Sequence, residues 1–191
     1  MIRKIVYSAV VAFTVLTLCG SGGAAAQERK NYVAIKAGFV TFTDRLDIAN
    51  LETGFDGEFV YGRYLSPNLS IEAGSGYFHD GVNKGYGNEV KGIPFTLTVK
   101  GIYPLRGWEL FGGGGVGLYS AKFHGLVNGT VTDAWDTVFG GHVVAGANID
   151  LFYRFFAGLE GKYLATERAD FRLFTSRLSS YSLRASLGFR F

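Results

Sequence analysis

Cysteine, proline and charge are all scarce in this sequence. Of its 191 residues, one is cysteine, three are proline and 18% are charged, whereas 48% are hydrophobic. So apolar a chain cannot be intrinsically disordered, and its length suits one domain. Residues 1–26 hold two bases and no acid, which leaves 17 basic and 16 acidic side chains in residues 27–191. That balance, without a basic stripe or a base-reading motif, excludes nucleic acid as a partner.

Residues 1–26 have the pattern of a cleaved secretory signal. Arg3 and Lys4 precede an uncharged apolar run over 5–18, and small residues follow as far as Ala26. Because the run is shorter than the roughly 20 residues of a membrane-spanning helix, it predicts export and cleavage after Ala26. Lipid attachment at Cys19 is the alternative, although the residue before this cysteine fits the cleavage motif of bacterial lipoproteins poorly. Cleavage after Ala26 removes the cysteine and with it disulfides, a catalytic thiol and thiolate metal sites.

Residues 27–191 alternate between apolar and small or polar side chains. The alternation is strict over residues 180–191, and only an extended strand turns such a pattern into two different faces. Seven further runs show the same period, over 33–39, 57–61, 69–77, 93–103, 110–118, 139–151 and 153–163. Short turns alternate with long polar segments near 42–53, 79–90, 122–134 and 165–179. The sequence therefore predicts an all-β fold, an eight-stranded antiparallel up-and-down transmembrane barrel over residues 27–191.

A soluble barrel with the apolar face inside is the alternative architecture. Two features oppose it. The apolar faces carry aromatic residues on most strands, which is too much bulk for an eight-stranded interior. The other face is rich in glycine and serine and has few charges, whereas a water-facing surface carries roughly 25–35% charged residues. The apolar face is therefore expected to contact lipid, and the face rich in small residues (the small face) is expected to line the lumen.

Charges on the small face fall into pairs of opposite sign when each hairpin is folded about the centre of its loop. Centres at residues 47, 86 and 172 give three pairs, Lys36 with Glu58, Glu72 with Lys100, and Glu160 with Arg184. Cross-strand neighbours have Cβ atoms about 5 Å apart, so such pairs can form ion pairs.

The remaining hairpin has no such pair. Folding it about residue 128 places His142 beside two glycines, and folding the next turn about residue 152 places Lys162 opposite His142 with Glu160 one diagonal step away. The sequence thus predicts a lumen network of Lys36, Glu58, Glu72, Lys100, His142, Glu160, Lys162 and Arg184.

The export signal, the eight alternating segments and the C-terminal strand resemble the small outer-membrane barrel family. This group includes the outer-membrane protein A transmembrane domain, outer-membrane protein W and the opacity proteins. The most specific element is the last strand, in which Tyr181, Leu187, Phe189 and Phe191 match the apolar and aromatic pattern of the family. The resemblance implies that this strand is recognised by the outer-membrane assembly machinery. We expect a monomer embedded in outer-membrane lipid.

No catalytic site, cofactor site or metal site is expected. An acyl-transferring barrel needs a serine, histidine and carboxylate group, and only His142 of the three histidines falls within a predicted span. Its inward orientation is wrong for a lipid substrate, and the histidines are too far apart to form a metal cluster.

Three arginines occur in the last long loop, Arg168, Arg172 and Arg177, where they could hold lipopolysaccharide phosphates. Nearby acids make an ordinary solvated loop the alternative. We expect a structural or porin-like barrel with a charged, largely filled lumen. A narrow conduit or binder for small hydrophobic molecules, and adhesion through the outer loops, are the alternatives. A lipid A-modifying enzyme ranks last.

The signal assignment is tested by the intact mass of the protein extracted from outer membranes. We expect a chain that begins at Gln27, because the Ala-x-Ala site ends at Ala26. A mass that includes an acylated Cys19 would contradict this assignment.

Overall fold

The computed structural model describes residues 30–43, 53–79, 89–127, 130–170 and 175–191. The expected signal and Cys19 lie outside these residues. Within them the chain forms β-strands, and no helix is long and apolar enough to cross a bilayer. The strands are β1 (Asn31–Phe42), β2 (Gly54–Ser66), β3 (Leu69–His79), β4 (Glu89–Leu105), β5 (Trp108–Val127), β6 (Thr130–Asp150), β7 (Phe155–Thr166), β8 (Arg168–Asp170), β9 (Thr175–Arg177) and β10 (Ser180–Arg190).

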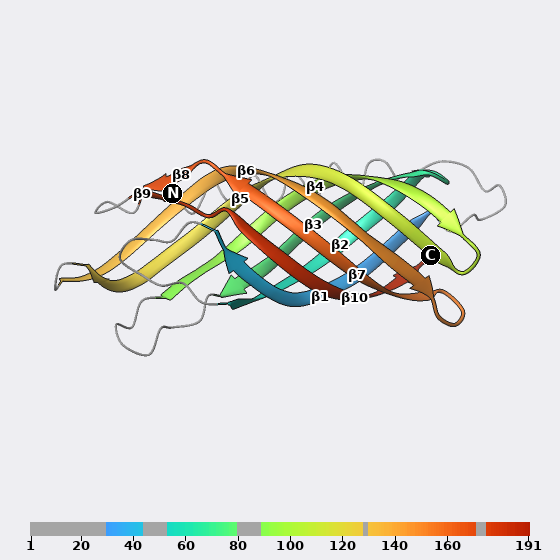
Figure 1. Cartoon of the computed structure of the whole chain (residues 1–191), viewed down its shortest axis with the longest axis horizontal. Coiled ribbons are helices and arrows are strands. Elements are labelled where there is room, and N and C mark those ends of the chain that lie inside the picture. The colour runs from blue at the N-terminus through green and yellow to red at the C-terminus, as the bar shows by residue number, and fades with distance from the viewer. Residues whose placement is uncertain (1–29, 44–52, 80–88, 128–129, 171–174) are drawn as a thin grey trace.

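Eight strands close into an antiparallel barrel in the order β1-β10-β7-β6-β5-β4-β3-β2. The expected fold class is confirmed. Figure 1 shows the tilted strands, with the short turns and the C-terminus at one end of the barrel and the small β8–β9 sheet at the other. Closure leaves no unpaired sheet edge around the barrel wall, as a strand structure in lipid requires.

One expected loop is mostly strand. The segment 122–134 was predicted as a long polar loop, but β5 runs to Val127 and β6 starts at Thr130. Their ladder continues to the pair Val127 and Thr130. The apolar alternation stops earlier because it marks only the part of a strand that faces lipid, whereas backbone pairing needs no such pattern.

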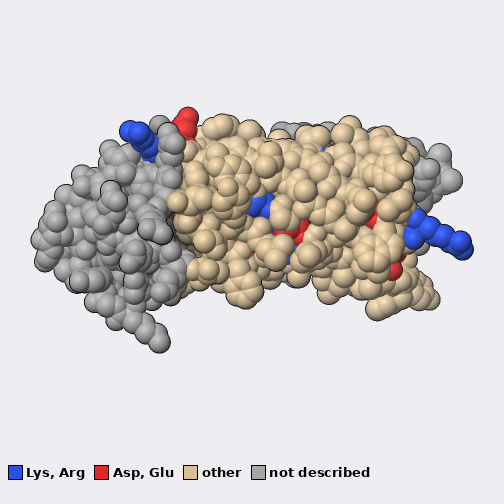
Figure 2. All heavy atoms as spheres, in the orientation of Figure 1, with Lys and Arg blue, Asp and Glu red and all other residues tan. Residues whose placement is uncertain are grey.

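Side chains alternate between an apolar outer wall and the lumen. Leu159 and Glu160 are neighbours in β7, yet Leu159 is 55% exposed on the outer wall and Glu160 is 2% exposed inside. In Figure 2 tan side chains cover most of this face of the barrel wall; charged residues project at its two ends, and small areas of blue and red show between the tan side chains in the middle. A wall of this kind is suited to hydrocarbon.

Large aromatic rings also enter the lumen, where the sequence predicts small and charged residues. Tyr32 lies opposite Gly62, and Phe156 lies opposite Gly188. A Cβ atom at either glycine would overlap the ring across the ladder. The glycines of the inner face thus make room for rings on the neighbouring strand, and the interior is fuller than the glycine content alone suggests.

The assignment of the outer, lipid-facing side of the barrel is tested at Leu159. Replacing it by arginine should destabilise the folded barrel by roughly 2–4 kcal/mol, because the charge would face lipid near the middle of the wall. Unfolding in urea from lipid vesicles measures the change, with Leu159→Val as the control. Equal stability of the two variants would contradict the assigned outer face.

Candidate functional site: the charged lumen

Eight charged side chains point into the middle of the lumen. Each is less than one tenth exposed, and the two signs are present in equal number. The acids are Asp56, Glu58, Glu72 and Glu160, and the bases are Lys36, Lys100, Lys162 and Arg184. Because burying an unpaired charge costs several kcal/mol, this balance is a condition for filling the lumen with charges.

Two lysines join two glutamates from opposite walls. Three strands separate β3, which carries Glu72, from β7, which carries Glu160, in either direction around the barrel. The Lys36 ammonium donates to both glutamates at 2.9 Å. The Lys100 ammonium donates to Glu72 at 2.9 Å and to Glu160 at 2.8 Å. These four side chains form a closed ring that bridges the lumen.

Arg184 on β10 extends this ring toward β2. One terminal nitrogen, Nη2, donates to Glu160, and the other, Nη1, donates to Glu58 and lies 3.5 Å from Oδ2 of Asp56. Thr96 donates to the second oxygen of Glu58 at 2.6 Å. The guanidinium suits this place because its fixed fork can serve two carboxylates at once.

The observed register agrees with two of the three predicted charge pairs. Lys36 lies opposite Glu58, and Glu160 lies opposite Arg184. The predicted pair of Glu72 and Lys100 is wrong by two positions, since Thr98 faces Glu72 and Ser70 faces Lys100. A shift of two keeps both side chains inside, and the lysine still reaches Glu72 along the diagonal.

His142 does not lie opposite Lys162, contrary to the prediction. Leu164 faces His142 across β6 and β7, and Lys162 faces Val144. The difference arises in the turn, which is centred at residue 153 rather than 152: the Leu151 N–H donates to the Phe155 carbonyl at 3.0 Å, and Tyr153 adopts a positive φ of 58°. His142 does lie opposite Gly115, and its Nε2 is 2.8 Å from the Thr98 hydroxyl. Tyr119 is the neighbour of its other ring nitrogen, at 3.5 Å.

The sequence interpretation missed a polar cluster at the turn end. There Arg190 on β10 donates to Asp150, to Glu109 at 2.8 Å and to the Tyr64 hydroxyl at 3.2 Å. Its guanidinium also lies over the ring of Phe156, 4.5 Å from the centroid. The alternation places Arg190 on the inner face, but the two acids come from turn-proximal positions on other hairpins, and no hairpin symmetry relates them to it.

Apolar clusters lie on both sides of the charged ring. On the turn side, the ring centroid of Tyr32 is 5.1 Å from Tyr64 and 5.8 Å from Phe156. The Tyr32 hydroxyl also donates to Glu72 at 2.7 Å, so this cluster contacts the ring directly. The loop-side cluster contains Phe78, Val90, Tyr119, Ala121, Ala134, Val138, Leu164 and Leu178.

The remaining predicted residues lie on the barrel wall or at the loop end. Tyr181 and Leu187 are exposed on the outer face of β10, Phe189 packs its ring 5.1 Å from Phe155, and Phe191 follows the strand. Arg168 and Arg177 face each other across β8 and β9, and Arg172 lies outside the described residues. Contact with lipopolysaccharide or with the assembly machinery stays a prediction.

The geometry defines a class of protein: a closed strand barrel with an apolar outer wall and buried charges within is a membrane-spanning barrel. The chain belongs to the outer membrane protein beta-barrel domain family, whose model matches residues 11–191. The family implies an outer-membrane location. No curated protein sequence matches this chain significantly.

Solved barrels of low sequence identity share the fold. Neisserial surface protein A (NspA) is 13% identical, with a TM-score of 0.67, and the match covers 84% of this chain and 97% of that one. The N-terminal β-barrel domain of OprF from Pseudomonas aeruginosa is 15% identical, with a TM-score of 0.56 and coverages of 85% and 98%. OprG from the same organism is 15% identical, with a TM-score of 0.53 and coverages of 85% and 96%.

The charged ring is tested by Glu160→Ala. This substitution should lower the free energy of unfolding by about 3–5 kcal/mol, because it leaves Lys36, Lys100 and Arg184 each without one carboxylate partner. The exposed Glu167→Ala at the loop end is the control, measured by unfolding in the same lipid vesicles. The role assigned to Glu160 fails if both variants lose equal stability.

Proposed function

We propose that this protein is a structural outer-membrane barrel, without enzymatic activity, whose lumen is closed to the flow of solutes. The ring of Lys36, Glu72, Lys100 and Glu160 carries the proposal, because it ties together two opposite walls of the barrel. The interior of an eight-stranded barrel is only just wide enough for its own side chains. A chain of ion pairs across that width leaves little space for a passing ion.

The two apolar clusters support closure independently of the charges. An ion that passed the charged ring would still meet the rings of Tyr32 and Phe156 on the turn side. On the loop side it would meet Phe78 and Leu164. Apolar constrictions oppose the entry of water and ions, so the lumen has three successive barriers.

The surroundings of His142 support a role without catalysis. His142 is buried, and its two ring nitrogens lie next to the hydroxyls of Thr98 and Tyr119. Within the described residues, no carboxylate is hydrogen-bonded to the ring in the way that a nucleophile-activating histidine requires. A lipid substrate on the outer wall would also face the opposite side of β6.

Planar-bilayer recording tests the closed lumen. The purified wild-type barrel is expected to leave the bilayer silent, with no sustained channel events. Glu160→Ala should produce events, since it removes a bridging side chain and leaves three cations that repel one another. The control Glu167→Ala should be as silent as the wild type. A steady wild-type conductance would contradict the proposal and favour a porin-like role.

A further inference from the structure

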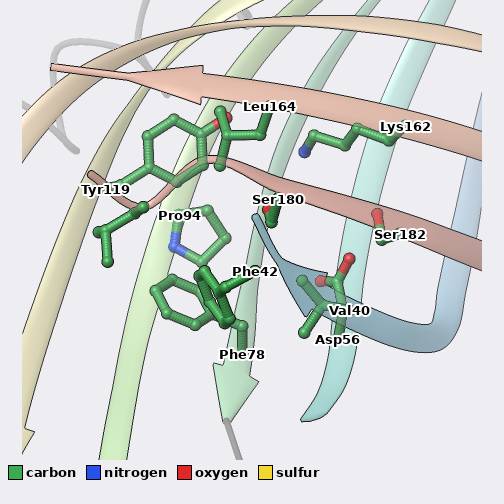
Figure 3. Close-up of a pocket in the computed structure, with 11 residues that line it drawn as sticks. Val40, Phe42, Asp56, Phe78, Pro94, Tyr119, Lys162, Leu164, Ser180 and Ser182 are labelled. Atoms are coloured by element: carbon green, nitrogen blue, oxygen red, sulfur yellow. The ribbon is translucent and has the colours of Figure 1, made fainter. Parts of the chain in front are cut away.

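The cavity between the charged ring and the loop-side cluster is too small for an organic ligand. It measures about 30 Å³, and Phe42, Phe78, Asp56 and Lys162 are among the residues that line it (Figure 3). A water needs roughly 10–15 Å³ of such space, so the cavity has room for about two waters. The four acids and four bases of the lumen also balance one another. Charge that is out of balance lies instead at the turn end of the barrel.

The turn end carries more basic than acidic side chains. Among the described residues it has two acids, Glu109 and Asp150, and both form ion pairs with Arg190. The other bases at this end are Lys30, Arg63, Arg106 and Arg154. Five bases against two acids leave a net charge of +3 on the described side chains of this end. Figure 2 shows blue side chains that project from it.

These four bases, here called the basic rim, are spread around the whole barrel. Lys30 precedes β1, Arg63 lies close to the β2–β3 turn, Arg106 lies in the β4–β5 turn and Arg154 lies in the β6–β7 turn. In the order of strands around the closed barrel, no two of them share a turn. A soluble partner docked on one side would contact only part of such a rim, whereas a membrane surrounds the barrel on every side.

Exposed apolar side chains accompany the basic rim. Leu65, Leu105 and Phe152 each lie within two residues of one of its arginines, and they are 58%, 48% and 68% exposed. Phe152 also begins a line of rings that runs onto the outer wall, 5.4 Å from Phe155, which lies 5.1 Å from Phe189. Apolar side chains next to bases suit the boundary of a bilayer, where the former reach hydrocarbon and the latter stay among the headgroups.

We propose that the basic rim binds the phosphate groups of anionic phospholipids. In an outer-membrane barrel the short turns are periplasmic, so the leaflet concerned is the periplasmic one. The planar guanidinium of arginine can donate two hydrogen bonds to one phosphate. A zwitterionic phospholipid carries its own cation beside the phosphate, so a cluster of bases favours an anionic lipid. The proposal adds a lipid partner to the structural role, and neither depends on the other.

Trp108 can report which lipid contacts the rim. It is 50% exposed on the outer wall, two residues after Arg106, and it faces Ile149 of β6, the strand that leads into the turn with Arg154. Trp135→Phe removes the second of the two tryptophans, so that Trp108 alone emits. This variant is folded into mixed vesicles of phosphatidylglycerol and phosphatidylcholine, in which one lipid at a time carries brominated chains that quench a tryptophan in contact with them.

Phosphatidylglycerol should bind around Trp108 at least about threefold more strongly than phosphatidylcholine, because each nearby base favours the anionic lipid. Salt of about 1 M should bring this ratio toward one, since it screens exposed charges. Equal quenching by the two lipids at low salt would overturn the proposal and favour an acidic soluble partner. A ratio that salt leaves unchanged would also overturn it, because the preference would then not come from charge.

Substitutions assign the preference to the rim. Replacing both arginines near Trp108, as R106Q together with R154Q, should reduce the ratio to about one. Arg168→Gln is the control, because it removes an exposed base at the loop end and leaves the rim intact. A double variant that keeps the ratio of the control would overturn the assignment of these arginines.

A soluble phosphate separates a lipid site from a site for free phosphate. Glycerol 3-phosphate has the phosphate of phosphatidylglycerol but no acyl chains to contact the apolar side chains beside the rim. It should therefore leave the quenching by brominated phosphatidylglycerol unchanged at millimolar concentration. Relief of the quenching by glycerol 3-phosphate would show a site for any small phosphate and would overturn the assignment of a lipid.

Discussion

Charge balance inside a narrow, buried lumen is the constraint on which this structure depends. Four acids and four bases occupy the middle of the lumen, and each is almost fully buried. In such surroundings a charge is tolerated only with a partner in good geometry. Lys36 and Lys100 therefore each serve two glutamates, and Arg184 serves Glu58 and Glu160, so that loss of one carboxylate affects several cations at once.

The face of each residue could be predicted from the sequence more securely than its partner. A strand has a period of two, so the two-residue error in the register of β3 and β4 left Glu72 and Lys100 on the inner face. Partners also depend on side-chain length. Lys36 lies opposite Glu58, yet its ammonium reaches Glu72 and Glu160. Hairpin symmetry describes backbone neighbours, and long side chains in a narrow barrel contact other strands.

Nothing in the hairpin symmetry of the sequence indicated contacts between distant strands. Arg190 forms ion pairs with Glu109 and Asp150 only because the closed barrel brings the turn ends of β10, β5 and β6 close together. The inward aromatic rings did have a signal, since Tyr32 and Phe156 occur in the same alternating register as Lys36 and Glu160. Their opposite glycines were interpreted as space for a narrow lumen, whereas that space is filled by the rings.

The bridge between the first and last strands has a consequence for how the barrel is built. Lys36 and Glu58 come from β1 and β2, whereas Glu160 and Arg184 come from β7 and β10. Until β1 pairs with β10, Lys36 cannot reach Glu160 and Glu58 cannot reach Arg184 across the interior. These two ion pairs therefore depend on the contact between β1 and β10, whereas Glu160 and Arg184 are neighbours within one hairpin. Separating β1 from β10 would thus leave Lys36, Glu58, Glu160 and Arg184 each without one partner.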